Sequence, residues 1–180
     1  MEVPGFVLSH AKPEDGADIV DFANETAGET NFFSFGRNQF SHSARSKSDE
    51  IRDLKVTSGI ILVLREEVEE GKGVLVGWAE THFKDQRRSS HVAWASVVVR
   101  KAFWRRGLGK WLFAELMREA EVSLKAEKVI LCVNATNTGA LKMYEEGFGF
   151  EREGVLTGET KIDGVYYDLV NLGKWLKKRV

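Results

Sequence analysis

The stretch from Val97 to Phe113 constrains the fold of this chain more than any other. It opens with Val97, Val98 and Val99, a β-branched run typical of a strand. A short basic turn follows, with Gly107 and Gly109 at its end. An apolar stripe of helical spacing comes next, formed by Leu108, Trp111, Leu112 and Leu116. The stretch therefore predicts a strand, a tight turn and an amphipathic helix in immediate succession.

The start of this predicted helix has the features of an anion site. The first N–H groups of a helix lack intrahelical partners, and the helix dipole places partial positive charge there. Gly107 and Gly109 let the backbone approach a ligand without an intervening Cβ atom. Arg105, Arg106 and Lys110 add three cations beside them. We therefore predict that the turn holds the phosphate groups of a ligand.

Two common phosphate-binding motifs do not fit this spacing. A P-loop needs a glycine five residues before Gly109 and a serine or threonine after the lysine, but Trp104 and Trp111 stand there. A dinucleotide-binding fingerprint needs a third glycine where this chain has Leu112. The ligand is therefore expected to belong to another class.

Length and charge exclude several function classes. With 180 residues, we expect one domain over 1–180. A formal net charge of −1 disfavours nucleic-acid binding. The sequence shows no signal peptide and no apolar run long enough to cross a membrane, which favours the cytoplasm. The single cysteine, Cys132, lies in an apolar run and is expected to be a buried, inert thiol.

The remaining chain alternates strand-type and helix-type segments. Strands are expected over 6–9, 60–64, 74–83, 91–99, 129–133 and in two segments from 150 onward, and helices over 13–25, 46–56, 108–125 and 138–146. Asp163-Gly164 is a hairpin signal. Hairpin-type strands followed by βαβ crossovers predict an α/β (α+β) fold. Its sheet should be single, mixed and mostly antiparallel, with a central parallel pair and helices on both faces.

Aromatic and acidic residues mark a second region. Phe33 and Phe35 stand with Glu29 in a polar, turn-rich segment. They either pack beneath a loop or line a pocket of which Glu29 is the acidic member. In the strand over 74–83, period-two alternation places Glu80 on the same face as Trp78.

Two motifs resemble those of the GNAT superfamily of acyl-CoA N-acyltransferases. Arg105-Arg106-Gly107-Leu108-Gly109 is similar to the end of the family's pyrophosphate loop. Asn137-x-x-Ala140-x-x-x-Tyr144, followed by Gly149-Phe150, is similar to its second block. Further similarity to the bacterial YhhY-like and phosphinothricin-acetyltransferase-like branch lies in Arg88–Ala93, Glu151–Gly154 and Gly164–Asp168.

The chain departs from the family pattern at two places. Trp104 stands where the family usually has glutamine or arginine. Gly149-Phe150 follows Tyr144 one residue later than is usual. We therefore expect a bulge at the end of the helix that carries Tyr144.

The resemblance implies acetyl transfer from acetyl-CoA to a primary amine, by direct attack on the thioester and without a metal ion. Arg105, Arg106, Gly107, Leu108, Gly109 and Lys110 would bind the diphosphate, and the backbone of Val97, Val98 and Val99 would bind the pantetheine arm and polarise the thioester carbonyl. Asn137 would lie near that arm, and Tyr144 would be the general acid.

The general base and the acceptor stay open at this level. Related enzymes often carry a glutamate where this chain reads Ala93-Trp94-Ala95. Glu80 is our first candidate for the base, and Glu29, His82, His91 or a water chain are alternatives. Glu29, Phe33 and Phe35 would shape a pocket for a small-molecule amine or amino acid. A protein N-terminus or lysine as acceptor, an inactive acyl-CoA sensor, and a homodimer formed through the C-terminal hairpin are further hypotheses.

Overall fold

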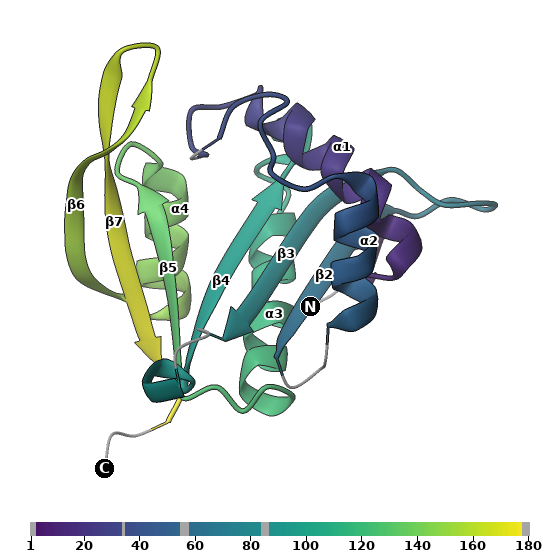
Figure 1. Ribbon diagram of the computed structural model, residues 1–180. Helices are drawn as coiled ribbons and strands as arrows, with labels where there is room; N and C mark the ends of the chain where they lie inside the picture. Colours follow the sequence, from purple (N-terminus) through teal and green to yellow (C-terminus); the bar gives the residue numbers. More distant parts are fainter. Residues whose placement is uncertain (1–2, 34, 55–57, 84–86, 178–180) are drawn as a thin grey trace.

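Seven strands form one sheet in the computed structural model of the chain, which describes residues 3–33, 35–54, 58–83 and 87–177 (Figure 1). The strands are β1 (Phe6–His10), β2 (Gly59–Glu66), β3 (Leu75–Phe83), β4 (Val92–Val99), β5 (Lys128–Asn134), β6 (Glu151–Ile162) and β7 (Val165–Trp175). Their order is β1-β2-β3-β4-β5-β7-β6, with β4 and β5 parallel and the other pairs antiparallel. The predicted fold class is confirmed.

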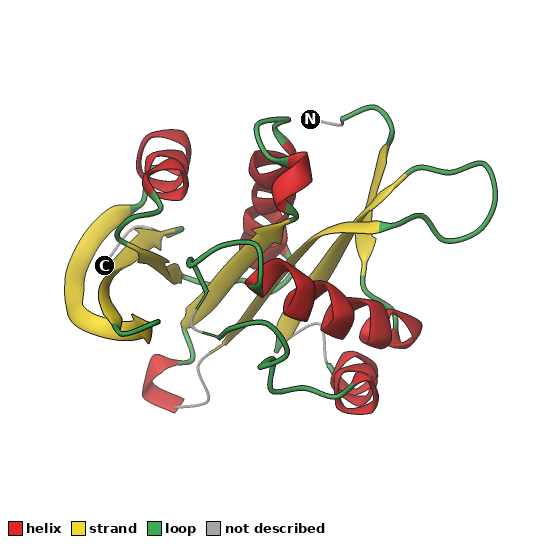
Figure 2. Ribbon diagram, turned by 90° about the horizontal axis from the view of Figure 1, so that it is seen from above, coloured by secondary structure: helices red, strands yellow, loops and turns green. Residues whose placement is uncertain are grey.

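Four helices cover both faces of the sheet (Figures 1 and 2). They are α1 (Gly16–Ala27), α2 (Ala44–Asp53), α3 (Leu108–Val122) and α4 (Thr138–Lys142). The predicted helix over 46–56 begins earlier, because the Ser43 side chain accepts the Ser46 N–H as an N-cap. Its expected end, 55–57, lies outside the described residues. The helix that was expected to reach Lys125 ends at Val122. No helix in the described ranges has the length and apolarity to span a bilayer.

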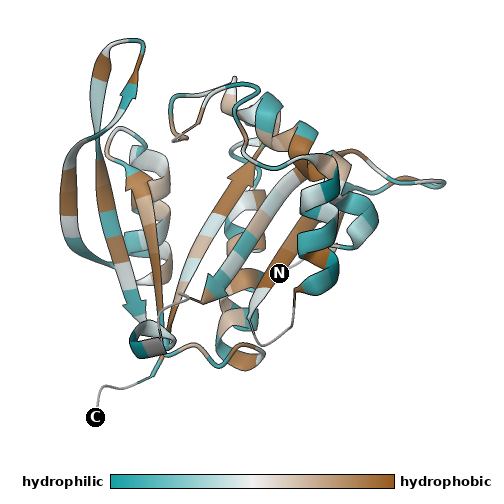
Figure 3. Ribbon diagram, viewed as in Figure 1, coloured by the Kyte–Doolittle hydropathy of each residue, from teal (hydrophilic) through white to brown (hydrophobic). Residues whose placement is uncertain are grey.

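The core explains which helices lie on which face. β2 is buried on both sides, because Ile61 and Val63 pack under α1 and α2 while Ile60, Leu62 and Leu64 pack under α3. Figure 3 shows that α2 is coloured almost entirely as hydrophilic. Only one of its apolar side chains is buried, so α2 is attached to the sheet by a narrow contact.

β4 and β5 separate along their length. They pair only from Val92–Lys128 to Trp94–Ile130, and their carboxyl ends then diverge (Figure 1). The Arg100 N–H donates to the Val76 carbonyl on the β3 side. Since hydrogen bonds alternate along an antiparallel strand, the N–H groups of Val97 and Val99 point away from β3, into the opening.

The predicted bulge near Tyr144 is present. A π-helical turn, Met143–Gly147, follows α4 directly, and Gly149 has φ +68°. A π turn accommodates one extra residue in a helix. This matches the one-residue delay of Gly149-Phe150, so the bulge absorbs the inserted residue and leaves Tyr144 directed at the core.

The expectation that Cys132 is buried is wrong. Leu131 and Val133 face the core beneath α3 and α4, so Cys132 faces the opposite side of β5. The helices α1 and α2 pack on β2 and β3 and leave this side of β5 uncovered (Figure 2). The thiol is therefore exposed, and it donates a hydrogen bond to Asn171 Oδ1 at 2.6 Å.

A four-residue ion cluster ties the β2–β3 hairpin to the start of α1. Arg65 Nη2 lies 2.8 Å from Asp15 Oδ1 and 2.6 Å from Asp18 Oδ2, and Lys72 Nζ lies within 3.0 Å of both carboxylates. Burial by itself raises the pKa of Asp15 and of Asp18. Hydrogen bonds from Lys72 and Arg65 outweigh burial, so both pKa values lie below the ordinary value.

Arg65→Met is expected to lower the free energy of unfolding at pH 7 by about 2–4 kcal/mol, because it leaves the buried Asp15 carboxylate and the partly exposed Asp18 carboxylate with one cation, Lys72. Since the folded-state aspartate pKa values are lowered, the contribution of the cluster is complete above about pH 4 and is lost as the pH falls through them. Urea unfolding at pH 7 and pH 3 measures this, with exposed Arg52→Met as control. A loss that is equal at both pH values would contradict the assignment.

Candidate active site

A cavity of about 780 Å³ opens where β4 and β5 separate. Its wall includes Val97, Leu108 and Tyr144 from the α3 and α4 side of the sheet. It also includes Trp78 and Val98 from the α1 and α2 side. The cavity therefore connects the two faces of the sheet through the opening between the parallel strands.

The predicted phosphate turn forms one end of this cavity. Gly107 is the N-cap of α3 and has φ +81°, a conformation that side chains rarely adopt. A Cβ atom at Gly109 would meet only Val99 Cγ2, at 3.7 Å, so the backbone there is open to a ligand. Arg105 and Lys110 also line the cavity. Exposed N–H groups, a helix start and two cations here suit a diphosphate.

Arg106 lies apart from these cations. Its guanidinium carbon is 5.0 Å from the centre of the Phe103 ring, and the residue does not line the cavity. Arg106 therefore packs on the outer side of the turn, whereas Leu108 faces the cavity from the first turn of α3. The residues predicted to bind the phosphates therefore lie on both sides of the turn: Arg106 on the outer side and Leu108 on the cavity side.

The valines of β4 and Trp104 form the middle of the cavity wall. Val97, Val98 and Val99 all line it. The Trp104 indole N–H donates to the Val99 carbonyl at 2.7 Å, and its ring stacks on Phe32 at 6.2 Å. The residue that departs from the family pattern thus joins the end of β4 to the segment after α1. The sequence motif alone did not indicate this contact.

Two asparagines lie at the far side of the opening. Asn137 caps α4 by accepting the Ala140 N–H at 3.2 Å, and it lines the cavity. Asn134, which the sequence analysis did not single out, is buried at the end of β5. It donates to the Asn31 carbonyl at 3.1 Å and accepts from Thr136. A polar residue closing an apolar strand was the only signal for it.

Tyr144 lines the cavity from the π turn. Its side chain is only 5% exposed and packs on Phe113 and Phe150, with ring centres 4.8 Å and 6.0 Å away. Burial raises the pKa of Tyr144 well above the ordinary tyrosine value. Within the described part of the chain, no residue hydrogen-bonds its hydroxyl. The phenol is therefore protonated at neutral pH and available to a ligand.

An aromatic wall forms the other end of the cavity. Phe33, Phe35, Phe40 and Trp78 contact one another in that order, with ring centres 5.4, 5.3 and 5.6 Å apart. All four line the cavity. Phe35 and Phe40 also pack against the core beneath α1 and α2. Phe35 and Phe40 therefore pack at the edge of the core and also line the cavity, whereas Phe33 lines the cavity without packing on that core cluster.

Glu29 lies at the junction of the two ends. Its carboxylate accepts the Lys101 N–H at 2.7 Å and lines the cavity. Nearby, Glu25 Oε2 pairs with Arg100 Nη1 at 2.6 Å. Glu29 therefore fixes the end of α1 to the turn that follows β4 and also supplies negative charge to the pocket.

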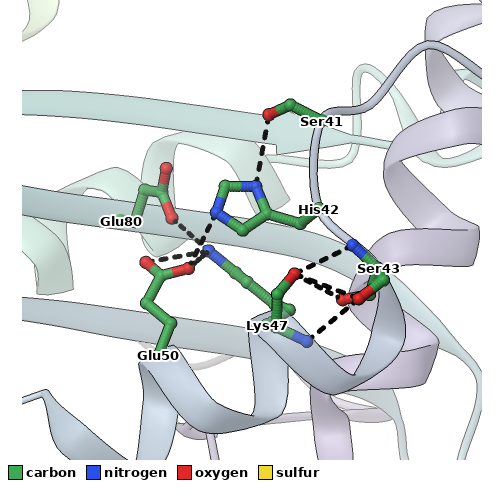
Figure 4. A network of polar contacts seen from close by, with 7 residues as sticks. Ser41, His42, Ser43, Lys47, Glu50 and Glu80 are labelled. Carbon is green, nitrogen blue, oxygen red and sulfur yellow. Dashed lines mark hydrogen bonds and ion pairs between the residues drawn. The ribbon is translucent and has the colours of Figure 1, made fainter.

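Glu80 belongs to a network that sequence reasoning missed (Figure 4). Lys47 Nζ, from α2, lies 3.0 Å from Glu80 Oε2 and 3.1 Å from Glu50 Oε2. The Lys47 side chain is only 2% exposed. His42 Nε2 is 3.3 Å from Glu50 Oε2, on the outer side. The sequence does not indicate this ion pair, because Lys47 lies in a polar helix and Glu80 in a distant strand.

The two histidine candidates for the base do not line the main cavity. His82 is exposed and shares with Glu80 a smaller hollow of about 230 Å³ beside the main cavity. His91 stacks on Trp175 with ring centres 6.1 Å apart and lines neither cavity. Glu80 is thus the carboxylate that the structure places on the wall of both hollows.

Comparisons with known proteins agree with this geometry. The profile of the Acetyltransferase (GNAT) family matches residues 25–150. A search of curated proteins finds no match. An acetyltransferase of the GNAT family from Streptococcus pneumoniae has a structure with a TM-score of 0.85 and 24% identity, covering 95% of this chain and 99% of its own.

Two further structures share the fold. That of yncA from Salmonella typhimurium, with its cofactor acetyl-CoA, has a TM-score of 0.82 and 18% identity, over 97% of this chain and 96% of its own. A candidate phosphinothricin N-acetyltransferase has a TM-score of 0.80 and 20% identity, over 96% of this chain and 99% of its own. These structures share the fold, and the family profile shows that the chain belongs to the GNAT family and is an acetyl-CoA-dependent N-acetyltransferase.

Proposed function

We propose that this enzyme acetylates the primary amine of a small molecule or amino acid. The observation that carries the proposal is the aromatic wall of Phe33, Phe35, Phe40 and Trp78, which is continuous with the phosphate turn in one cavity. A walled aromatic pocket suits a compact acceptor, whereas a protein acceptor needs an open groove for its chain.

The cofactor end of the cavity fits acetyl-CoA. Arg105, Lys110 and the open backbone at Gly107–Gly109 would hold the diphosphate. The free N–H groups of Val97 and Val99 would pair with the amides of the pantetheine arm, much as a neighbouring strand would. One of these N–H groups would also donate to the thioester carbonyl oxygen and stabilise the negative charge that develops there. Asn137 would line the path of the arm.

Proton transfer is assigned to Glu80 and Tyr144. A protonated amine must lose a proton before its nitrogen attacks the thioester carbon, and Glu80 would accept that proton. When the carbon–sulfur bond breaks, the Tyr144 hydroxyl would protonate the departing sulfur. We expect Glu80→Gln to lower kcat/KM for the amine about tenfold, with the Kd of acetyl-CoA unchanged.

The direct test is CoA release from acetyl-CoA with amines, amino acids, polyamines and short peptides. Turnover of one small-molecule class supports the proposal. Turnover of peptides alone would instead assign a protein N-terminus or lysine as acceptor. Tight acetyl-CoA binding without any turnover would favour a sensor.

Cys132 offers an independent test of where the cofactor binds. Cys132 is exposed, lines the cavity and is the only cysteine in the chain. Alkylation of the chain at cysteine therefore measures access to the cavity. We expect saturating acetyl-CoA to slow its alkylation by iodoacetamide about tenfold or more, measured by intact mass, because the bound arm covers the opening. Equal rates with and without acetyl-CoA would place the arm elsewhere.

We also propose that residues 1–180 act as one acetyltransferase unit, in the cytoplasm, as a homodimer. The support for the dimer is the β6–β7 hairpin, an edge of the sheet that exposes large apolar side chains at Val155, Leu156, Val165 and Tyr166. Sedimentation velocity of the full chain and of a Val155→Lys, Val165→Lys variant tests this. A wild-type monomer would overturn it.

A further inference from the structure

The acceptor end of the cavity carries an excess of negative charge. Around Glu80, one ammonium group, that of Lys47, faces two carboxylates, Glu80 and Glu50, at 3.0 and 3.1 Å (Figure 4). Together, the side chains of Lys47, Glu50 and Glu80 carry a net charge of −1. Glu29 adds a second carboxylate to the same cavity.

Among the described residues that line the cavity, no cation lies at the acceptor end to meet a negatively charged group on the acceptor. Among the described residues that line the cavity, the cations are Arg105 and Lys110, and both belong to the phosphate turn. Lys47 does not line the cavity, and both of its carboxylate partners already bind it. A carboxylate on the acceptor would therefore lie near Glu80 and Glu29 without a cationic partner among the described residues, which is costly in a partly buried site.

The same region suits a cation with an apolar body. Glu80 offers a carboxylate to an ammonium group, and the rings of Phe35, Phe40 and Trp78 offer an apolar surface with negative π faces. The ammonium of Lys47 already lies 5.0 Å from the centre of the Trp78 ring, which shows that this ring accepts a cation beside it.

We infer that the acceptor is a cationic amine with an apolar or aromatic body and without a carboxylate beside its amino group, such as an aralkylamine. This inference rests on the proposed function and narrows it, because it excludes free α-amino acids as the preferred acceptors. Glu80 binds the ammonium group, and the aromatic wall binds the body. Glu50 acts as a specificity-determining residue, because its charge makes the cluster negative without touching the acceptor.

The test uses three acceptors that share one aromatic body: phenethylamine, phenylalanine and phenylalaninamide, assayed by CoA release at pH 8. Phenylalaninamide has the bulk of phenylalanine without its negative charge, so it separates charge from size. We expect kcat/KM for phenethylamine to exceed that for phenylalanine about tenfold or more, with phenylalaninamide close to phenethylamine.

A variant tests the charge count. Glu50→Gln leaves the Lys47–Glu80 pair and makes the cluster neutral, so the preference for phenethylamine over phenylalanine should shrink about threefold or more. Glu69→Gln, on the exposed β2–β3 hairpin, removes an equal charge outside the cavity and should leave the preference unchanged. An unchanged preference in Glu50→Gln would overturn the role of Glu50.

The outcomes separate this inference from the proposed function. If phenylalanine is acetylated as well as phenethylamine or better, the inference is wrong while the small-molecule function stands. If all three compounds are inert and a peptide with a free N-terminus is acetylated, the proposed function is wrong and the inference falls with it.

Discussion

Tyr144→Phe is expected to lower kcat about 100- to 1,000-fold while the Kd of acetyl-CoA stays unchanged. The change removes one hydroxyl group from a ring that is held by Phe113 and Phe150. Because burial raises the pKa of Tyr144, the phenol stays protonated throughout the range in which the enzyme is assayed. Its proton is therefore available when the sulfur leaves, and phenylalanine cannot supply it.

The measurements are steady-state kinetics and calorimetric titration with acetyl-CoA, with Tyr166→Phe as the matched control. Tyr166 is 64% exposed on β7, so loss of its hydroxyl should change neither quantity. The thermal midpoint of Tyr144→Phe should stay within a few degrees of wild type, because no described residue hydrogen-bonds the missing group. A fall in kcat below threefold would remove Tyr144 from the reaction.

Gly109→Glu is expected to weaken acetyl-CoA binding about 100-fold or more. A side chain at 109 meets only Val99 Cγ2, at 3.7 Å, so it extends into the cavity rather than into the protein. Its carboxylate would occupy the positive end of α3, where the diphosphate is proposed to bind. Repulsion between like charges about 5 Å apart, at an effective dielectric constant of about 20, accounts for a loss of this size.

The free energy of unfolding of Gly109→Glu should rise slightly, although its affinity for acetyl-CoA falls. A carboxylate in the first turn of a helix interacts favourably with the dipole, by about 0.3–1 kcal/mol. Weak binding therefore cannot be explained by unfolding. Gly147→Glu, at an exposed glycine with open space around it, is the control and should bind acetyl-CoA like wild type. Normal binding by Gly109→Glu would place the diphosphate elsewhere.

Local patterns predicted the elements that form the phosphate turn well. The strand, turn and helix of residues 97–113 depend on β-branching, two glycines and helical spacing, all of which act between near neighbours. The delayed Gly149-Phe150 likewise predicted a bulge, which the structure forms as a π turn, because one extra residue in a helix has few other solutions. These features depend little on how the rest of the sheet is covered.

Two features of the cavity could not be predicted from the sequence. The exposure of Cys132 depends on which strands α1 and α2 cover, and no residue near Cys132 encodes that. The contact of Lys47 with Glu80 joins a polar helix to a strand 33 positions away. No sequence pattern around Lys47 or Glu80 indicates that the two side chains pair. Tertiary packing, rather than local preference, decides both.

In the binding mode proposed above, acetyl-CoA takes the place of a strand in the sheet where β4 and β5 separate. In the free enzyme, the amides of Val97 and Val99 belong to a central strand but have no neighbouring strand on one side. Hydrogen–deuterium exchange should therefore be fast at these two positions and slow at Val98, which pairs with Trp78 on β3. Bound cofactor should slow exchange at Val97 and Val99 to the rate at Val98. β4, a central strand by its position, would thus exchange like an edge strand in the free enzyme and like a paired strand once acetyl-CoA is bound.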